Sequence, residues 1–286
     1  MQIAWQQRTI IVILLIWSIL PVSLAWGAPL PGPLPPAPPP IPTPPATGYD
    51  HYTILQAPAG NPGQIVFGTP ENDMIAQYGD TDTATQYAEG AAGNDWLLQV
   101  GGPQGSDQTA ISGDGNDIIY QYGGQGDSTQ FAGGAGTGTK QFIQVGGQGA
   151  NDMTIYGGSG KNTIQQYGGA QINHMYIASG ASDDVIEMYG GPGQNTWRYD
   201  LSAGNDVVTI MGGGGYNTLT INKNQQNFIL KDYQGRVLFQ SGSGGSTITV
   251  ANLNRITVIG DDLKTIIYTF NPGGVPAAII APLLLN

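Results

Sequence analysis

The chain reads GAAGNDWLLQV at positions 90–100 and SGDGNDIIYQY at positions 112–122, so one pattern returns after 22 residues. Each copy opens with a glycine-rich turn that ends in Asn-Asp and continues with a short apolar segment. A repeat of this length cannot bury its own apolar face, so neighbouring repeats must stack and share one core. The two copies therefore predict a solenoid.

The same period extends along most of the chain. One column of mostly apolar residues returns every 22 or 23 positions, at Tyr78, Val100, Tyr122, Val145, Tyr167, Tyr189 and Met211. A second column lies between them, at Tyr87, Ile111, Phe131, Tyr156, Ile177, Tyr199 and Ile221. Short segments rich in Ile, Val, Tyr and Thr, bounded by glycine pairs, favour strands over helices. We expect an all-β fold, a parallel β-solenoid (β-roll or β-helix) of about seven two-strand coils over residues 68–221.

The N-terminal residues predict export. Residues 1–25 have the features of a signal peptide, with Arg8 before the apolar run 9–20 and Ser23-Leu24-Ala25 as a cleavage site. An uncleaved membrane anchor is the alternative, because residues 9–26 are about long enough to span a bilayer. We expect a secreted, extracellular or cell-surface protein. Residues 26–48 contain eleven prolines and predict either a polyproline II linker or an unimportant leader. We interpret residues 49–67 as a segment that leads into the rod or caps its N-terminal end.

The C-terminal part has a different pattern. Short alternating segments at 227–230, 237–240, 247–250, 256–259 and 266–270 predict strands, and we interpret residues 222–271 as a cap for the bare last coil. Residues 272–286 form an apolar tail. The stretch from Val275 to Leu285 either folds back on its own rod or adds a strand to a neighbouring copy, which would give a head-to-tail polymer.

Charge and cysteine usage restrict the function further. Residues 68–221 carry 16 acidic side chains against three basic ones, whereas residues 222–286 have a net charge of +2. An acidic rod repels phosphate, so we expect no nucleic-acid partner. The sequence has no cysteine, which excludes disulfides and thiolate metal sites.

The turns at 90–98 and 112–120 resemble the calcium-binding nonapeptide of the RTX (repeats-in-toxin) family, Gly-Gly-x-Gly-x-Asp-x-apolar-x. This resemblance covers roughly residues 68–221 and implies a calcium-loaded β-roll and secretion. Four features depart from the family: a longer coil, asparagine in many turns, an extra residue in several turns such as Gly149-Ala150-Asn151-Asp152, and an export signal at the N-terminus instead of the C-terminus. Toxin or hydrolase activity is not implied.

Aspartates stack at the turns and are the candidate Ca²⁺ ligands. On one side they are Asp73, Asp95, Asp117, Asp184 and Asp206, interrupted by Lys140 and Asn162. On the other side they are Asp107, Asp127 and Asp152, followed by Asn173, Asn195 and Asn217, and Asp114 lies within a turn. Carboxylates on coils about 4.8 Å apart repel one another unless a cation lies between them, and calcium takes oxygen ligands of this kind. The alternative is that Asp and Asn simply favour turns.

A column of Gln77, Gln99, Gln121, Gln144 and Gln166 precedes the first apolar column. Stacked glutamines predict an amide ladder, and the alternative is a polar face that binds a sugar or a surface.

Catalytic side chains are scarce, with two histidines and three glutamates in the chain. A polysaccharide lyase or epimerase, which is the least favoured reading, would need a base beside a positive group. We expect instead a non-enzymatic structural protein of the cell surface or extracellular matrix, a self-associating filament subunit stabilised by calcium. A calcium-dependent adhesin or glycan-binding module that uses the Gln/Tyr faces is the alternative.

Overall fold

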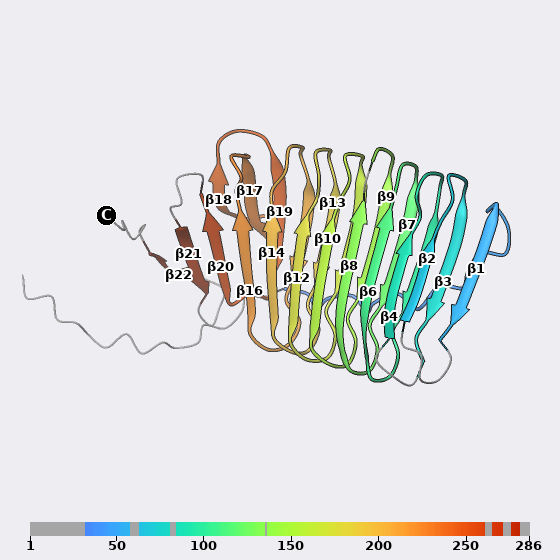
Figure 1. The fold of residues 1–286 in the computed structure, drawn as a ribbon. Coiled ribbons are helices and arrows are strands. Elements are labelled where there is room, and N and C mark those ends of the chain that lie inside the picture. Colours follow the sequence, from blue (N-terminus) through green and yellow to red (C-terminus); the bar gives the residue numbers. More distant parts are fainter. Residues whose placement is uncertain are drawn as a thin grey trace, which may run out of the picture.

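The computed structural model describes residues 32–57, 63–80, 84–134 and 136–260, together with the backbone of 265–270 and 276–280. The signal-peptide prediction lies outside these residues, as does most of the apolar tail. All the regular elements described are strands, and they form two sheets that face each other along the whole rod (Figure 1). The predicted β-solenoid with two strands per coil is confirmed.

Strands alternate between the sheets as the chain winds. In spatial order, sheet A contains β1 (His51–Gln56), β3 (Asp73–Tyr78), β5 (Trp96–Val100), β7 (Asp117–Tyr122), β9 (Lys140–Val145), β11 (Asn162–Tyr167), β13 (Val185–Tyr189), β15 (Val207–Met211), β19 (Ser246–Ala251), β17 (Phe228–Asp232) and β18 (Val237–Ser241). Sheet B contains β2 (Gly63–Phe67), β4 (Ala84–Glu89), β6 (Gly105–Ser112), β8 (Asp127–Gly134), β10 (Asn151–Tyr156), β12 (Asn173–Ala178), β14 (Asn195–Asp200), β16 (Asn217–Asn222), β20 (Arg255–Ile259), β21 (Thr265–Phe270) and β22 (Pro276–Ile280).

The described residues form nine coils, two more than expected. β1 and β2 form coil 1 from the residues expected to lead into the rod. This coil escapes the sequence pattern because polar Gln56 is paired with Tyr78 of the apolar column. β19 and β20 form coil 9 from part of the expected cap. It is hidden because an inserted hairpin separates Met211 from its partner Ala251 by 40 residues.

The inserted hairpin reverses the order of the last strands in sheet A. β17 pairs in parallel with β19, and β18 pairs antiparallel with β17. β19 then returns to the position between β15 and β17. Phe228 and Phe239, with ring centroids 5.3 Å apart, close this end of the core. In sheet B, β21 and β22 extend the edge in antiparallel pairing, so β22 of the predicted tail pairs within its own chain.

One predicted column is wrong in register. The inward column of sheet B consists of Ala88, Ala110, Ala132, Ile155, Ile177, Tyr199 and Ile221, all fully buried. The predicted second column shares only its last three members with this set. Tyr87 and Phe131 precede the inward position by one residue, and Ile111 and Tyr156 follow it by one. Because side chains alternate across a strand, a shift of one residue places them on the outer face.

Glutamines form two buried ladders in the core. In sheet A the Nε2 of Gln99 donates to Oε1 of Gln77 at 2.8 Å, and Gln121, Gln144 and Gln166 continue the series at 2.7–2.8 Å. All five side chains are 0% exposed, so the predicted ladder is confirmed and the alternative of a polar binding face is wrong. A second ladder, which the sequence analysis missed, runs through sheet B at Gln64, Gln86, Gln108 and Gln130.

The described part of the proline-rich segment, residues 32–48, lies against the rod, and we call it the strap. Asn252 of coil 9 donates to the carbonyl of Pro33 at 2.8 Å, and Tyr122 of coil 4 donates to that of Pro40 at 2.9 Å. Seven residues of polyproline II span ~22 Å and five coils span ~24 Å, so an extended segment fits this distance. The strap therefore runs back along the first apolar column behind the sheets (Figure 1), instead of projecting away from the rod as a free linker would.

Candidate cation sites in the turns

Each coil has two turns, and each turn ends in a residue that stacks with its counterparts. The turns that lead into sheet A, called A turns, end in Asp73, Asp95, Asp117, Lys140, Asn162, Asp184 and Asp206. The turns that lead into sheet B, called B turns, end in Ser106, Ser128, Asn151, Asn173, Asn195 and Asn217. All of these side chains are buried.

Asparagine turns supply their own hydrogen-bond donors. In its A turn, Nδ2 of Asn162 donates to the carbonyls of Gly160 and Gly158, which stand two and four residues earlier, at 2.8 and 3.4 Å. Asn173 donates in the same way to Gln171 and Gly169 in its B turn. In each of these turns, two backbone carbonyls thus point toward the last side chain, and its amide nitrogen donates a hydrogen bond to both.

A carboxylate cannot donate to these carbonyls, so the aspartate turns differ. In all of them except the first, Oδ1 of the aspartate accepts a backbone N–H from the preceding coil. Asp95 accepts from Asp73 and Asp117 from Asp95, both at 2.9 Å, and Asp184 and Asp206 accept in the same way. The Oδ2 atoms have different fates. Thr69 donates to Oδ2 of Asp73, and the hydroxyls of Tyr199 and Ser179 donate to Oδ2 of Asp206.

Among the buried side chains that the structure describes, two carboxylate oxygens have no hydrogen-bond partner, namely Oδ2 of Asp95 and Oδ2 of Asp184. Both side chains are only 1% exposed. Burial raises the pKa of each carboxyl to about 7, and the neighbouring carboxylates add to the effect, Asp117 and Asp73 for Asp95 and Asp206 for Asp184. A buried carboxylate without a counter-charge costs free energy, so these two turns are the ones in which a cation would stabilise the fold.

The surroundings of these two atoms suit a hard cation. Ala91 and Gly93 stand four and two residues before Asp95, as Gly180 and Ser182 do before Asp184, and these are the positions whose carbonyls Asn162 contacts in its own turn. A carboxylate oxygen combined with backbone carbonyls is the ligand type that Ca²⁺ prefers. Within the described ranges, no three His, Cys, Asp or Glu side chains gather as a metal-binding group.

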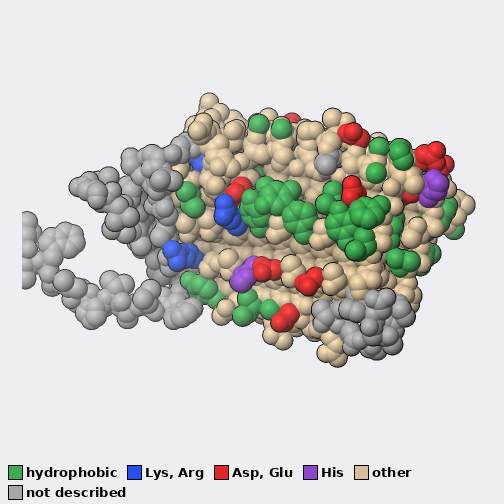
Figure 2. Space-filling model, in the orientation of Figure 1, with side chains coloured by type: hydrophobic (Ala, Val, Ile, Leu, Met, Phe, Trp, Pro, Cys, Tyr) green, Lys and Arg blue, Asp and Glu red, His purple; other side chains and the backbone are tan. Residues whose placement is uncertain are grey.

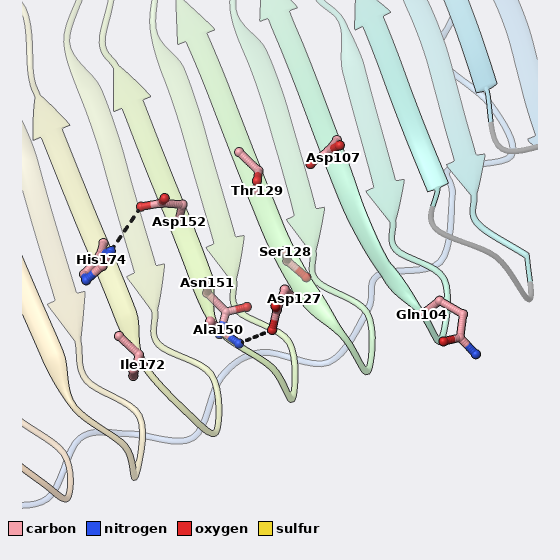
Figure 3. Close-up of a pocket in the computed structure, with 10 residues that line it drawn as sticks. All are labelled: Gln104, Asp107, Asp127, Ser128, Thr129, Ala150, Asn151, Asp152, Ile172 and His174. Carbon is pink, nitrogen blue, oxygen red and sulfur yellow. Dashed lines mark hydrogen bonds and ion pairs between the residues drawn. The ribbon is translucent and has the colours of Figure 1, made fainter.

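The remaining candidate ligands do not stack as expected. Asp114 and Asp127 are exposed, and each accepts a backbone N–H of the next coil, from Thr137 and Ala150 respectively, at 2.8 Å. Asp107 and Asp152 lie on the outer face of sheet B, beside an open groove, where Asp152 pairs with His174 at 3.5 Å (Figure 3).

The B-turn row itself is formed by residues one position away. Ser106 precedes Asp107, and Asn151 precedes Asp152. The shift of one residue reverses the face, as it does for the second apolar column.

A comparison with family models, with curated proteins and with solved structures found no match. None of the residues that the structure describes forms a helix long and apolar enough to span a membrane.

Proposed function

We propose that this chain is an exported, non-enzymatic structural protein of the cell surface or extracellular matrix that assembles end to end. The observation that carries the proposal is the outer edge of coil 1, with which no strand of the described residues pairs. β1 and β2 are the outermost strands of the two sheets, and their outer faces expose Ile54 at 59%, Ile65 at 67% and Phe67 at 67% beside that edge. A solenoid end of this kind needs a cover, because open strand edges pair with other chains.

A second copy of the chain is the occupant that fits this edge. The opposite end of the rod presents β18 and β22 as the outer strands of the same two sheets, so a stacked copy would continue both. The charges are also opposite. Asp50 lies in coil 1 and Glu71 lies beside it in coil 2, where it contacts His51, whereas Lys231 and Arg255 lie near the other end. Such complementarity favours head-to-tail stacking and one register.

Calcium is the proposed cofactor, bound at the A turns of Asp95 and Asp184. The two orphaned carboxylate oxygens support this, and so does the resemblance of residues 90–98 to the RTX nonapeptide, which places an aspartate ligand at Asp95. When bound, the ion would supply the positive charge that these turns lack. The other seven candidate aspartates either have protein donors or are exposed.

Assembly is tested by sedimentation velocity and negative-stain electron microscopy of the purified chain. The wild type is expected to form filaments as its concentration rises. Charge placed on the edge, as in Ile54→Lys with Ile65→Lys, should leave single rods. Val207→Lys is the control, because Val207 is 56% exposed but lies on the side of the rod in β15. Filaments of the edge variant that match the wild type would refute the proposal.

Glycan binding is the second candidate function, and an aromatic stripe on the outer face of sheet B favours it. Ring centroids lie 5.6 Å apart for Phe67 and Tyr87, and 5.5 Å apart for Tyr156 and Tyr176. Figure 2 shows hydrophobic side chains gathered along the middle of this face. Aromatic faces pack well against sugar rings. Co-sedimentation of monomeric rods with insoluble neutral polysaccharides, lost in Tyr156→Ala, would favour this function over the first.

A further inference from the structure

Lys140 places a positive charge inside the A turn that ends in Asp117. Its Nζ lies 2.6 Å from Oδ2 of Asp117 and 2.6 Å from each carbonyl oxygen of Gly113 and Gly115, with the carbonyl of Thr137 at 3.3 Å. The side chains of Lys140 and Asp117 are 1% and 0% exposed. The ammonium group is therefore enclosed by four oxygen atoms from two coils, which is a cation in a cage of hard ligands.

The cage occupies the same place in its turn as the amide nitrogens do elsewhere. Gly113 and Gly115 stand four and two residues before Asp117, as Gly158 and Gly160 stand before Asn162. In the Asn162 turn the donor belongs to the turn itself. In the Asp117 turn it is delivered from the next coil, by a lysine that reaches back about one coil spacing.

The backbone around Lys140 is adapted to this arrangement. Asp107 is paired with Thr129 and Asp117 with Lys140, so the step from sheet B to sheet A takes ten residues in one coil and eleven in the next. The additional residue of the only 23-residue interval in the first column therefore lies in the turn that leads into Lys140. The additional residue that interrupts the 22-residue period therefore stands in the turn that positions the lysine.

We propose that Lys140 is a built-in substitute for a bound metal ion, and that Gly113, Gly115, Asp117 and Thr137 form a latent cation site. The site would take a hard cation such as Ca²⁺ once the ammonium is removed. The proposal shares its chemistry with the sites proposed at Asp95 and Asp184, but the lysine cage is observed independently of them.

The test removes the ammonium and counts bound ions. Lys140→Ala in a chelator should lower Tm by roughly 10 °C, because a buried carboxylate and its carbonyls lose their counter-charge. Saturating Ca²⁺ should restore at least half of that loss. Calorimetry with Ca²⁺, or luminescence with Tb³⁺, should detect one more ion per chain than in the wild type.

Three variants control this result. Lys161→Ala removes an exposed lysine and should change neither Tm nor the ion count. Lys140→Met removes the charge but fills the cage, so it should be destabilised without rescue by Ca²⁺. In Asp117→Asn with Lys140→Ala, the new amide can donate to Gly113 and Gly115 as Asn162 does in its own turn, so this double variant should be stable in chelator and bind no additional ion.

Separate outcomes bear on the two proposals. A wild type that binds no Ca²⁺ contradicts the sites at Asp95 and Asp184, yet Lys140→Ala should still gain one ion. The inference about Lys140 is overturned if Lys140→Ala gains no ion or if its Tm does not respond to Ca²⁺. It is also overturned if Lys140→Ala and the Asp117→Asn double variant both stay unfolded with Ca²⁺ present.

Discussion

At the scale of single residues, the core glutamines all point the same way along the rod. Within each ladder, the Nε2 of a glutamine donates to the Oε1 of the glutamine one coil nearer to coil 1. The two ladders end at Gln166 and Gln130, whose Oε1 atoms are buried without a partner. The reason is that the next positions are Met188 and Met153, which cannot donate. A ladder member is therefore worth more in the middle than at the end.

We predict that Gln121→Leu destabilises the protein more than Gln166→Leu does. The first substitution strands Oε1 of Gln99, one N–H of Gln144 and the carbonyl of Phe131. The second strands Oε1 of Gln144 and loses only long bonds, of 3.3 and 3.4 Å, to the carbonyls of Met153 and Tyr176, and it removes an Oε1 that already lacks a partner. Each stranded buried group costs about 1–3 kcal/mol, so the losses should differ by roughly a factor of two. Urea unfolding of both variants measures this, and equal losses would show that the ladder contributes no more than local packing.

At the scale of elements, the strap joins parts of the rod that the winding chain keeps apart. It contacts coil 9 through Asn252 and coil 4 through Tyr122, and just after its end the N–H of Asp50 in coil 1 donates to the carbonyl of Asn72 in coil 2. Proline fixes the backbone angle φ in advance, so an extended strap loses little conformational entropy when it docks. The strap thereby restrains the relative positions of distant coils.

Replacing residues 33–41 with a glycine-serine segment of equal length should detach the strap. The Tm should fall by a few degrees, and the pKa of Tyr122, which burial raises to about 12, should move back toward 10. An ultraviolet pH titration of tyrosinate follows this shift. Tyr122→Phe in both backgrounds identifies the signal of that one residue. An unchanged titration in the replaced chain would mean that the strap does not cover Tyr122.

At the scale of the whole molecule, the acidic turns link stability to pH. The folded-state pKa values of Asp95 and Asp184 are raised from 3.8 to about 7, so between these limits the folded chain binds more protons than the unfolded chain. In the ion-free protein, the contribution of these two carboxyls to the free energy of unfolding is therefore largest below pH 4, and it is lost as pH rises to about 7. A bound Ca²⁺ favours the ionised carboxylates and should reverse this slope.

Thermal unfolding from pH 4.5 to 8 in chelator should accordingly show that Tm falls as pH rises. The free energy of unfolding should decrease by up to about 1.4 kcal/mol per pH unit for each carboxyl. Asp95→Asn with Asp184→Asn should flatten the profile and remove the effect of Ca²⁺, since asparagine needs no ion. Asp114→Asn, at an exposed position, is the matched control and should leave the slope unchanged. A rising profile in chelator would contradict the prediction.

The sequence predicted those features that every coil repeats. The period of 22 residues and the glutamine column are local patterns, so the solenoid and one ladder could be recognised without a structure. The position of β19 between β15 and β17 could not, because it depends on pairing between distant segments. The strap has no periodicity that indicates a docking site. The contact of Lys140 with the preceding turn depends on a side-chain conformation, which the sequence does not show. The sequence indicated only that Lys140 interrupts the row of aspartates.

The order of the last strands determines how the rod acquires its length. Each of the first eight coils can be laid on the one before as synthesis proceeds, because its neighbour already exists. The ninth is different: its strand in sheet A must settle between β15 and β17, and the chain forms β17 first. The addition of one coil at a time therefore ends in a step in which residues 223–254 must fold together. Adding or removing an internal coil would lengthen or shorten the rod, but the solenoid would still end at this segment. Residues 223–254 therefore specify the end of the solenoid.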